Sequence, residues 1–167
     1  MCHFYSSFFM VIMVHFVNEL VHVFAFQFSH FILEAFAIGH HPSGLLDTDQ
    51  LELMLRANAG RPTMVCVMAV HNETGVIQPI EKLSKLVKAH GGILLSDMTQ
   101  AIGKVPIDLT ASGADFAIAS GHKFGALPGV GFLYAKRRSN LLPLIAGGGQ
   151  ESGQRGGTQN YPGILSI

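Results

Sequence analysis

Polar side chains that could take part in catalysis follow two short apolar stretches in the second half of the chain. Asp97 comes directly after the first stretch, and Gln100 lies three residues further on. Ser120, His122 and Lys123 come at the end of the next stretch. If both stretches are strands of an open α/β sheet, these side chains meet at the crevice beyond the carboxyl ends of the strands, where ligands bind.

An amine and a carboxylate at such a crevice are groups that pyridoxal phosphate (PLP) chemistry needs. Lys123 could form a Schiff base with the cofactor, and Asp97 could keep the pyridine nitrogen protonated so that the ring acts as an electron sink. Both residues also have a common structural explanation. An aspartate at a strand end often caps a turn, and a single lysine is usually a solvated surface group. The spacing alone leaves both interpretations open.

The second half of the chain contains patterns that predict the helices and strands needed to position these residues. Residues 47–57 form a helical pattern that begins with the capping types Asp47, Thr48 and Asp49. Pro79 opens a second amphipathic helix, which two glycines end. Apolar runs predict strands at 63–70, 93–96, 115–120 and 130–135, and the Gly-rich stretch 147–157 predicts a loop. Strands that alternate with helices predict an α/β fold with a mainly parallel sheet flanked by helices.

The first 41 residues differ in composition from the rest. They hold nine of the twelve phenylalanines and six of the nine histidines, and no lysine or arginine occurs before Arg56. The apolar stretch 8–28 is interrupted by four polar residues, Glu19 among them, and it lacks basic flanks. A membrane span and a signal peptide are therefore both disfavoured.

The four polar residues that interrupt this stretch are His15, Asn18, Glu19 and His22, at the spacing of one helix face. A metal site is conceivable there, but a polar helix face explains the pattern more simply, and we assign no metal site. Residues 22–28 favour a strand through their β-branched and aromatic content, and residues 31–37 are interpreted as helical.

Charge and cysteine content limit the classes of protein. The formal net charge is zero, so no basic excess predicts a nucleic-acid partner. The two cysteines, Cys2 and Cys66, are too few for a disulfide framework or a zinc site. Cys66 lies in a continuous apolar run and is predicted to be buried and inert. A reducing compartment, and hence the cytoplasm, is expected.

Six motifs follow one another in a recognisable order. They are HNETGVIQPI from His71, SDMTQAIGK from Ser96, SGHKFG from Ser120, PGVG from Pro128, GGGQE from Gly147 and RGGT from Arg155. The series resembles the cysteine desulfurases of the class V aminotransferase group, which are fold-type I PLP enzymes. It extends over residues 43–167. The resemblance implies that residues 42–167 are part of the PLP-binding large domain of such an enzyme, preceded by an atypical segment at 1–41.

The resemblance also implies roles for individual residues. Lys123 becomes the Schiff-base lysine, and Asp97 the partner of the pyridine nitrogen. Gln100 would hydrogen-bond the phenolic oxygen of the cofactor, and Asn72 would lie beside the cofactor and the substrate carboxylate. His30 would stack on the ring, because His22 and His30 keep the spacing of a family pattern in which the last histidine does so. Ala25 and Ser29 replace the Thr and Glu of that pattern, so a chance match in a His-rich stretch is the alternative.

The phosphate group has its own set of residues in the resemblance. Ser120 and His122 would bind it, and His122 would also take part in catalysis beside the lysine. Thr158 would reach the phosphate of the partner subunit across a homodimer. Hydroxyl groups and Gly-rich backbone amides are suitable anion donors.

Two features of the family are missing from the sequence. A Gly-Ala-Thr-type phosphate loop is not found in residues 1–20, and no catalytic cysteine on a mobile loop follows the RGGT motif. Cys66 stands in the wrong place to replace that cysteine. The family reaction converts L-cysteine to L-alanine and leaves an enzyme-bound persulfide, whose sulfur goes to acceptor or Fe–S scaffold proteins. We expect a partial enzyme that cannot desulfurate cysteine by itself.

Other interpretations remain open at this stage. A selenocysteine lyase or another class V enzyme would share most of the motifs. From a different class, the chain could be a non-catalytic remnant or dimerisation partner that keeps the fold. A membrane-anchored protein rests only on the apolar start.

Overall fold

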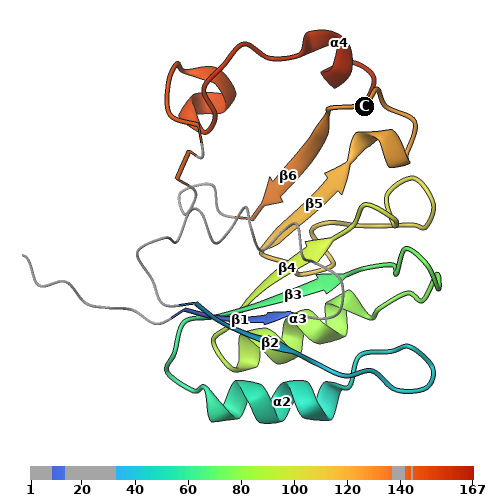
Figure 1. Cartoon of the computed structure of the whole chain (residues 1–167), viewed down its shortest axis with the longest axis vertical. Coiled ribbons are helices and arrows are strands. Elements are labelled where there is room, and N and C mark those ends of the chain that lie inside the picture. The colour runs from blue at the N-terminus through green and yellow to red at the C-terminus, as the bar shows by residue number, and fades with distance from the viewer. Residues whose placement is uncertain (1–8, 14–32, 137–141, 144) are drawn as a thin grey trace, which may run out of the picture.

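The computed structural model describes residues 9–13, 33–136, 142–143 and 145–167. Within these residues six strands form one sheet in the order β2-β1-β3-β4-β5-β6 (Figure 1). The strands are β1 Phe9–Met13, β2 Leu33–Ala37, β3 Thr63–Met68, β4 Ile93–Asp97, β5 Phe116–Ser120 and β6 Gly131–Ala135. Every neighbouring pair is parallel except β5 and β6, which are antiparallel. The predicted, mainly parallel α/β sheet is confirmed.

Two helices of ten residues each connect the strands and cover one face of the sheet (Figure 1). Helix α2, Thr48–Ala57, begins where the capping residues predicted it. The Oδ1 atom of its N-cap, Asp47, accepts hydrogen bonds from the amides of Asp49 at 3.0 Å and Gln50 at 2.9 Å. Helix α3, Ile80–Ala89, starts directly after Pro79. Both helices are confirmed at their predicted places.

The hydrophobic core lies between these helices and the sheet. Its fully buried members include Leu51, Leu55, Leu83 and Val87 from the helices, and Val65, Val67, Leu94 and Ala117 from the strands. Each large side chain buried in this way stabilises the fold by about 1.5–3 kcal/mol relative to leaving it in water. Because side chains alternate along a strand, Leu95 and Asp97 point to the opposite face of β4 from Leu94.

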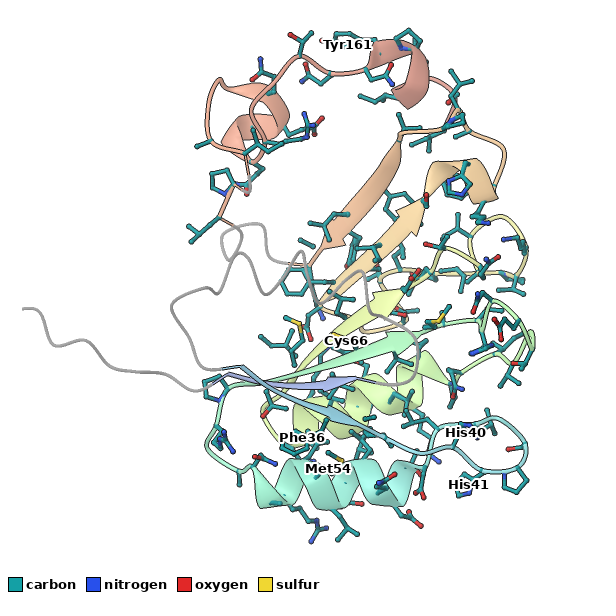
Figure 2. The ribbon with its side chains drawn as sticks, in the orientation of Figure 1. Phe36, His40, His41, Met54, Cys66 and Tyr161 are labelled. Carbon is teal, nitrogen blue, oxygen red and sulfur yellow. The ribbon has the colours of Figure 1, made fainter. Side chains whose placement is uncertain are left out.

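The interpretation of residues 31–37 as helical is wrong over Leu33–Ala37, which form strand β2. This strand pairs in parallel with β1, from Phe9 opposite Leu33 to Met13 opposite Ala37. Its sequence, LEAFA, consists mostly of strong helix formers. Pairing with β1 overrides that local preference, as tertiary context commonly does. The side chain of Phe36 is labelled in Figure 2.

Several other predictions concern residues that the structure does not describe. The polar helix face at 15–22, the strand at 22–28 and His30 all lie outside the described residues. Of the helices that are described, none has both the length and the apolar content to cross a membrane.

The Gly-rich stretch 147–157 forms an irregular segment that contains a short 3-10 helix, η3, Gln150–Gly153. Two non-glycine residues in it, Glu151 and Ser152, have positive φ angles of 48° and 57°. The chain ends in a single helical turn, α4, Tyr161–Ile164, which the sequence did not predict. The loop predicted at 147–157 is therefore confirmed, apart from the short 3-10 helix η3.

Candidate active site at the ends of β4 and β5

The last residues of β4 and β5 place two predicted site residues at one edge of the sheet. Strands β3, β4 and β5 run in the same direction, so their carboxyl ends meet at this edge (Figure 1). Asp97 is the last residue of β4 and Ser120 the last of β5. The register pairs Asp97 with Ile118, two residues before Ser120. Both polar side chains therefore point to the sheet face away from α2 and α3.

The lysine lies in a tight turn that follows β5. This turn is the 3-10 helix η1, Gly121–Lys123, and both His122 and Lys123 are exposed. The hydroxyl of Ser120 lies 2.9 Å from Nδ1 of His122 in a hydrogen bond. Gly121 is buried, and a Cβ atom there would come within 2.9 Å of the Val130 carbonyl oxygen. Only glycine fits this position, which is why the turn can bring the three polar residues together.

Thr99 connects the two strand ends, a role that the sequence analysis missed. Its amide donates to Oδ1 of Asp97 at 2.8 Å, and its hydroxyl oxygen accepts from the amide of Ser120 at 3.2 Å. An Asp two residues before such an amide is a frequent turn pattern, so the first contact was open to prediction. The second contact crosses between strands and has no signal in the local sequence.

A shallow depression of about 420 Å³ lies beside these contacts. Thr99 and Ser120 line its polar part, and the remainder is lined by residues 118–119 of β5 and by residues 130–133, where β6 begins. A volume of this size lies within the range of small-molecule sites. Asp97 and Lys123 are not among its lining residues, so the depression covers only one side of the candidate site.

Three other predicted residues are held elsewhere. Gln100 accepts a hydrogen bond from Nζ of Lys104 at 2.8 Å within the loop after β4. Asn72 is exposed in the turn after β3, in which Nδ1 of His71 accepts from the amides of Glu73 and Thr74 at 3.3 and 3.2 Å. Thr158 is exposed between η3 and α4. Within the described part of the chain, neither Asn72 nor Thr158 forms a hydrogen bond with Asp97 or Lys123.

The comparison with protein families decides what kind of chain this is. A family model described as aminotransferase class-V matches residues 32–166. The chain belongs to the class-V aminotransferase family. The resemblance inferred from the six motifs is confirmed, and the mostly parallel sheet is the fold of its solved relatives.

Individual class-V relatives are similar over most of this chain. A cysteine desulfurase of Nostoc sp. is 44% identical over 124 residues, which are 74% of this chain and 30% of the relative. The X-ray structure of a NifS-like protein from Rickettsia africae is 30% identical with a TM-score of 0.77, and the match covers 93% of this chain and 42% of that one. The structure of SspA in complex with cysteine is 33% identical with a TM-score of 0.76, covering 94% and 45%. The chain thus spans less than half the length of each relative.

Cys66 is confirmed as buried. Cys66 lies in the middle of β3 with 4% of its surface exposed (Figure 2). Burial raises the pKa of its thiol to about 12 because the thiolate would lose its hydration. At pH 8 only about one molecule in ten thousand then carries the reactive thiolate. Cys66 is therefore unsuited to nucleophilic chemistry, as the sequence analysis predicted.

This burial leads to a direct test with a thiol reagent. In a Cys2→Ser variant, the thiol of Cys66 is expected to react with iodoacetamide at pH 8 at least about a hundredfold more slowly in the folded chain than in urea. Mass spectrometry of the alkylated protein measures both rates. Equal rates in the folded and unfolded chain would contradict the buried state.

Among the described residues, no group of three or more His, Cys, Asp or Glu side chains is arranged to hold a metal ion. The chemistry available at the strand ends is that of a carboxylate, two hydroxyls, an imidazole and a primary amine, contributed by Asp97, Thr99, Ser120, His122 and Lys123.

Proposed function

We propose that this chain is the PLP-binding part of a cysteine desulfurase. The observation that carries the proposal is that Asp97 and the turn with Lys123 lie at the ends of adjacent parallel strands, linked through Thr99. The similarity to proteins named cysteine desulfurases, and to a structure determined with cysteine, supports the choice of substrate. The substrate and product of the whole protein would be L-cysteine and L-alanine.

The donor groups at the strand ends fit PLP. Oδ1 of Asp97 accepts from the Thr99 amide, and among the described residues no hydrogen bond to Oδ2 is seen, so Oδ2 can accept the proton of a pyridine nitrogen. The hydroxyl of Ser120 and the imidazole of His122 are paired and can both face a phosphate ester. When bound, PLP supplies an electron sink for bonds to the substrate α-carbon.

The residues of this chain would then have separate roles around the bound cofactor. Lys123 is exposed at the end of η1 and can hold the cofactor covalently and later carry a proton, with His122 as its neighbour in the turn. Gln100 would leave Lys104 to reach the phenolic oxygen. Asn72 and His30 are proposed beside the ring, as the family resemblance implies.

Two further parts of the proposal concern partners. Thr158 lies exposed on the C-terminal segment, which suits a contact to the phosphate of a second subunit in a homodimer. Sulfur would pass to acceptor or Fe–S scaffold proteins in the cytoplasm. The buried Cys66 is not the thiol that accepts sulfur from the substrate.

Retention of PLP by the purified chain tests this function. We expect close to one PLP per chain after incubation and gel filtration, measured by the fluorescence of PLP released in alkali. Pyridoxal, which lacks the phosphate, should be retained at least about tenfold less because the charge-assisted bonds to the phosphate are lost. Equal retention of both compounds, or no retention of PLP, would favour the non-catalytic remnant.

A further inference from the structure

Thr99 makes one hydrogen bond to the end of β4 and one to the end of β5, the two strand ends that form the candidate site. Its backbone amide binds the Asp97 carboxylate at 2.8 Å, and its side-chain oxygen binds the Ser120 amide at 3.2 Å. The residue is half-buried, and it lines the 420 Å³ depression beside Ser120. No other described residue contacts both strand ends through its own polar atoms.

The geometry of the sheet explains why a hydroxyl is needed at this point. The backbone bonds between β4 and β5 continue as far as the Met98 amide, which donates to the Ile118 carbonyl at 2.8 Å. Peptide groups that face the neighbouring strand alternate along β5, so the next amide after Ile118 that faces β4 is that of Ser120. The carbonyl of Met98, which would be the next acceptor on this side of β4, instead accepts from the amides of Ala101 and Ile102 at 2.9 Å each. The Thr99 hydroxyl takes the place of the missing carbonyl acceptor.

We propose that Thr99 is a positioning residue, which fixes the Asp97 carboxylate and the Ser120–His122 pair relative to each other. Its amide holds Oδ1 and so directs Oδ2 toward the ring nitrogen of a bound cofactor. Its hydroxyl anchors the end of β5, from which the Ser120 hydroxyl and the η1 turn project. The link to the cofactor rests on the proposed function, whereas the link between the two strand ends does not.

Amide hydrogen exchange in the cofactor-free chain tests the positioning directly. Thr99→Val keeps the shape of the side chain and removes the acceptor, so the Ser120 amide should exchange about tenfold faster by NMR. Thr99→Ser restores the hydroxyl and should exchange within about twofold of wild type. The amides of Leu51 and Val87, buried in the helices, report whether the whole chain is destabilised. If Thr99→Val does not fold, Thr99→Ala is compared with Thr99→Ser in its place.

The chain offers a matched control in Thr110. Its amide donates to Oδ1 of Asp108 at 2.8 Å, the same turn that joins Thr99 to Asp97, but the loop is exposed and lies away from the strand ends. Thr110→Val should leave the exchange of the Ser120 amide unchanged. This control separates the loss of a particular hydrogen bond from the general effect of valine in such a turn.

The affinity for PLP gives a second measurement. Thr99→Val should raise the dissociation constant about tenfold, and Thr99→Ser should bring it back to within about twofold of wild type. An unchanged Ser120 amide in Thr99→Val, or a serine variant that behaves like the valine variant, overturns the inference. A wild-type chain that retains no PLP overturns the proposed function, while the exchange of the Ser120 amide still decides the role of Thr99.

Discussion

Replacing Lys123 with alanine is expected to abolish covalent capture of PLP while leaving the folding of the chain unchanged. Lys123 is exposed at the last position of η1, and its side chain belongs to no part of the core. Exposed substitutions away from special features change stability by less than about 0.5 kcal/mol. The amine is nevertheless the only group in the turn that can form an imine with an aldehyde.

Reduction with borohydride followed by peptide mapping measures this result. The wild-type chain should carry the pyridoxyl group on Lys123, and the Lys123→Ala chain should carry none at this position. Lys123→Arg is the sharper variant, because it keeps the positive charge that attracts the phosphate but cannot form an imine. Urea unfolding of all three proteins would show whether stability is constant.

Lys85 provides the control for nonspecific reaction with surface amines. Its side chain is 76% exposed and is paired with Glu81 at 2.6 Å on α3, the helix on the opposite face of the sheet from Asp97 and Ser120. Lys85→Arg should leave the amount and position of the label unchanged. A label spread evenly over exposed lysines, or retained in the Lys123→Ala chain, would contradict the assignment of Lys123.

Much of this fold could be predicted because its signals are local. The entry to α2 through Asp47 and the start of α3 after Pro79 follow from capping chemistry that acts within one helical turn. The buried strands β3 and β4 follow from uninterrupted apolar runs. The position of Asp97, Ser120 and Lys123 at one edge of the sheet could be predicted because the carboxyl ends of parallel strands meet there.

The features that were missed depend on contacts between distant parts of the chain. Strand β2 has a sequence that favours a helix, and only its pairing with β1 makes it a strand. The hydroxyl of Thr99 finds its partner on β5, 21 residues away, and no local pattern identifies that partner. No local pattern identifies the antiparallel pairing of β6 with β5 either, and the close approach of these two strands depends on one glycine.

That glycine is Gly131, and replacing it with alanine should lower the free energy of unfolding by about 3 kcal/mol. Gly131 opens β6 opposite Ser120. A Cβ atom at this position would lie 2.5 Å from the Ala119 carbonyl oxygen, well inside contact distance. Because the neighbouring atom belongs to the backbone of β5, it can move only if the pairing of β5 and β6 is disturbed. Glycine in a strand commonly marks such a close approach.

Urea unfolding of Gly131→Ala and Gly149→Ala measures the effect against a matched control. A Cβ atom on Gly149 would meet nothing within 4 Å, and the residue has a φ of −81° that alanine adopts readily. Its variant should stay within about 0.5 kcal/mol of wild type. Gly131→Ala should also retain less PLP, because a shift of β5 moves Ser120 away from Thr99. Two variants of equal stability would mean that β6 adapts without strain, and the close approach at Ala119 would then not limit the site.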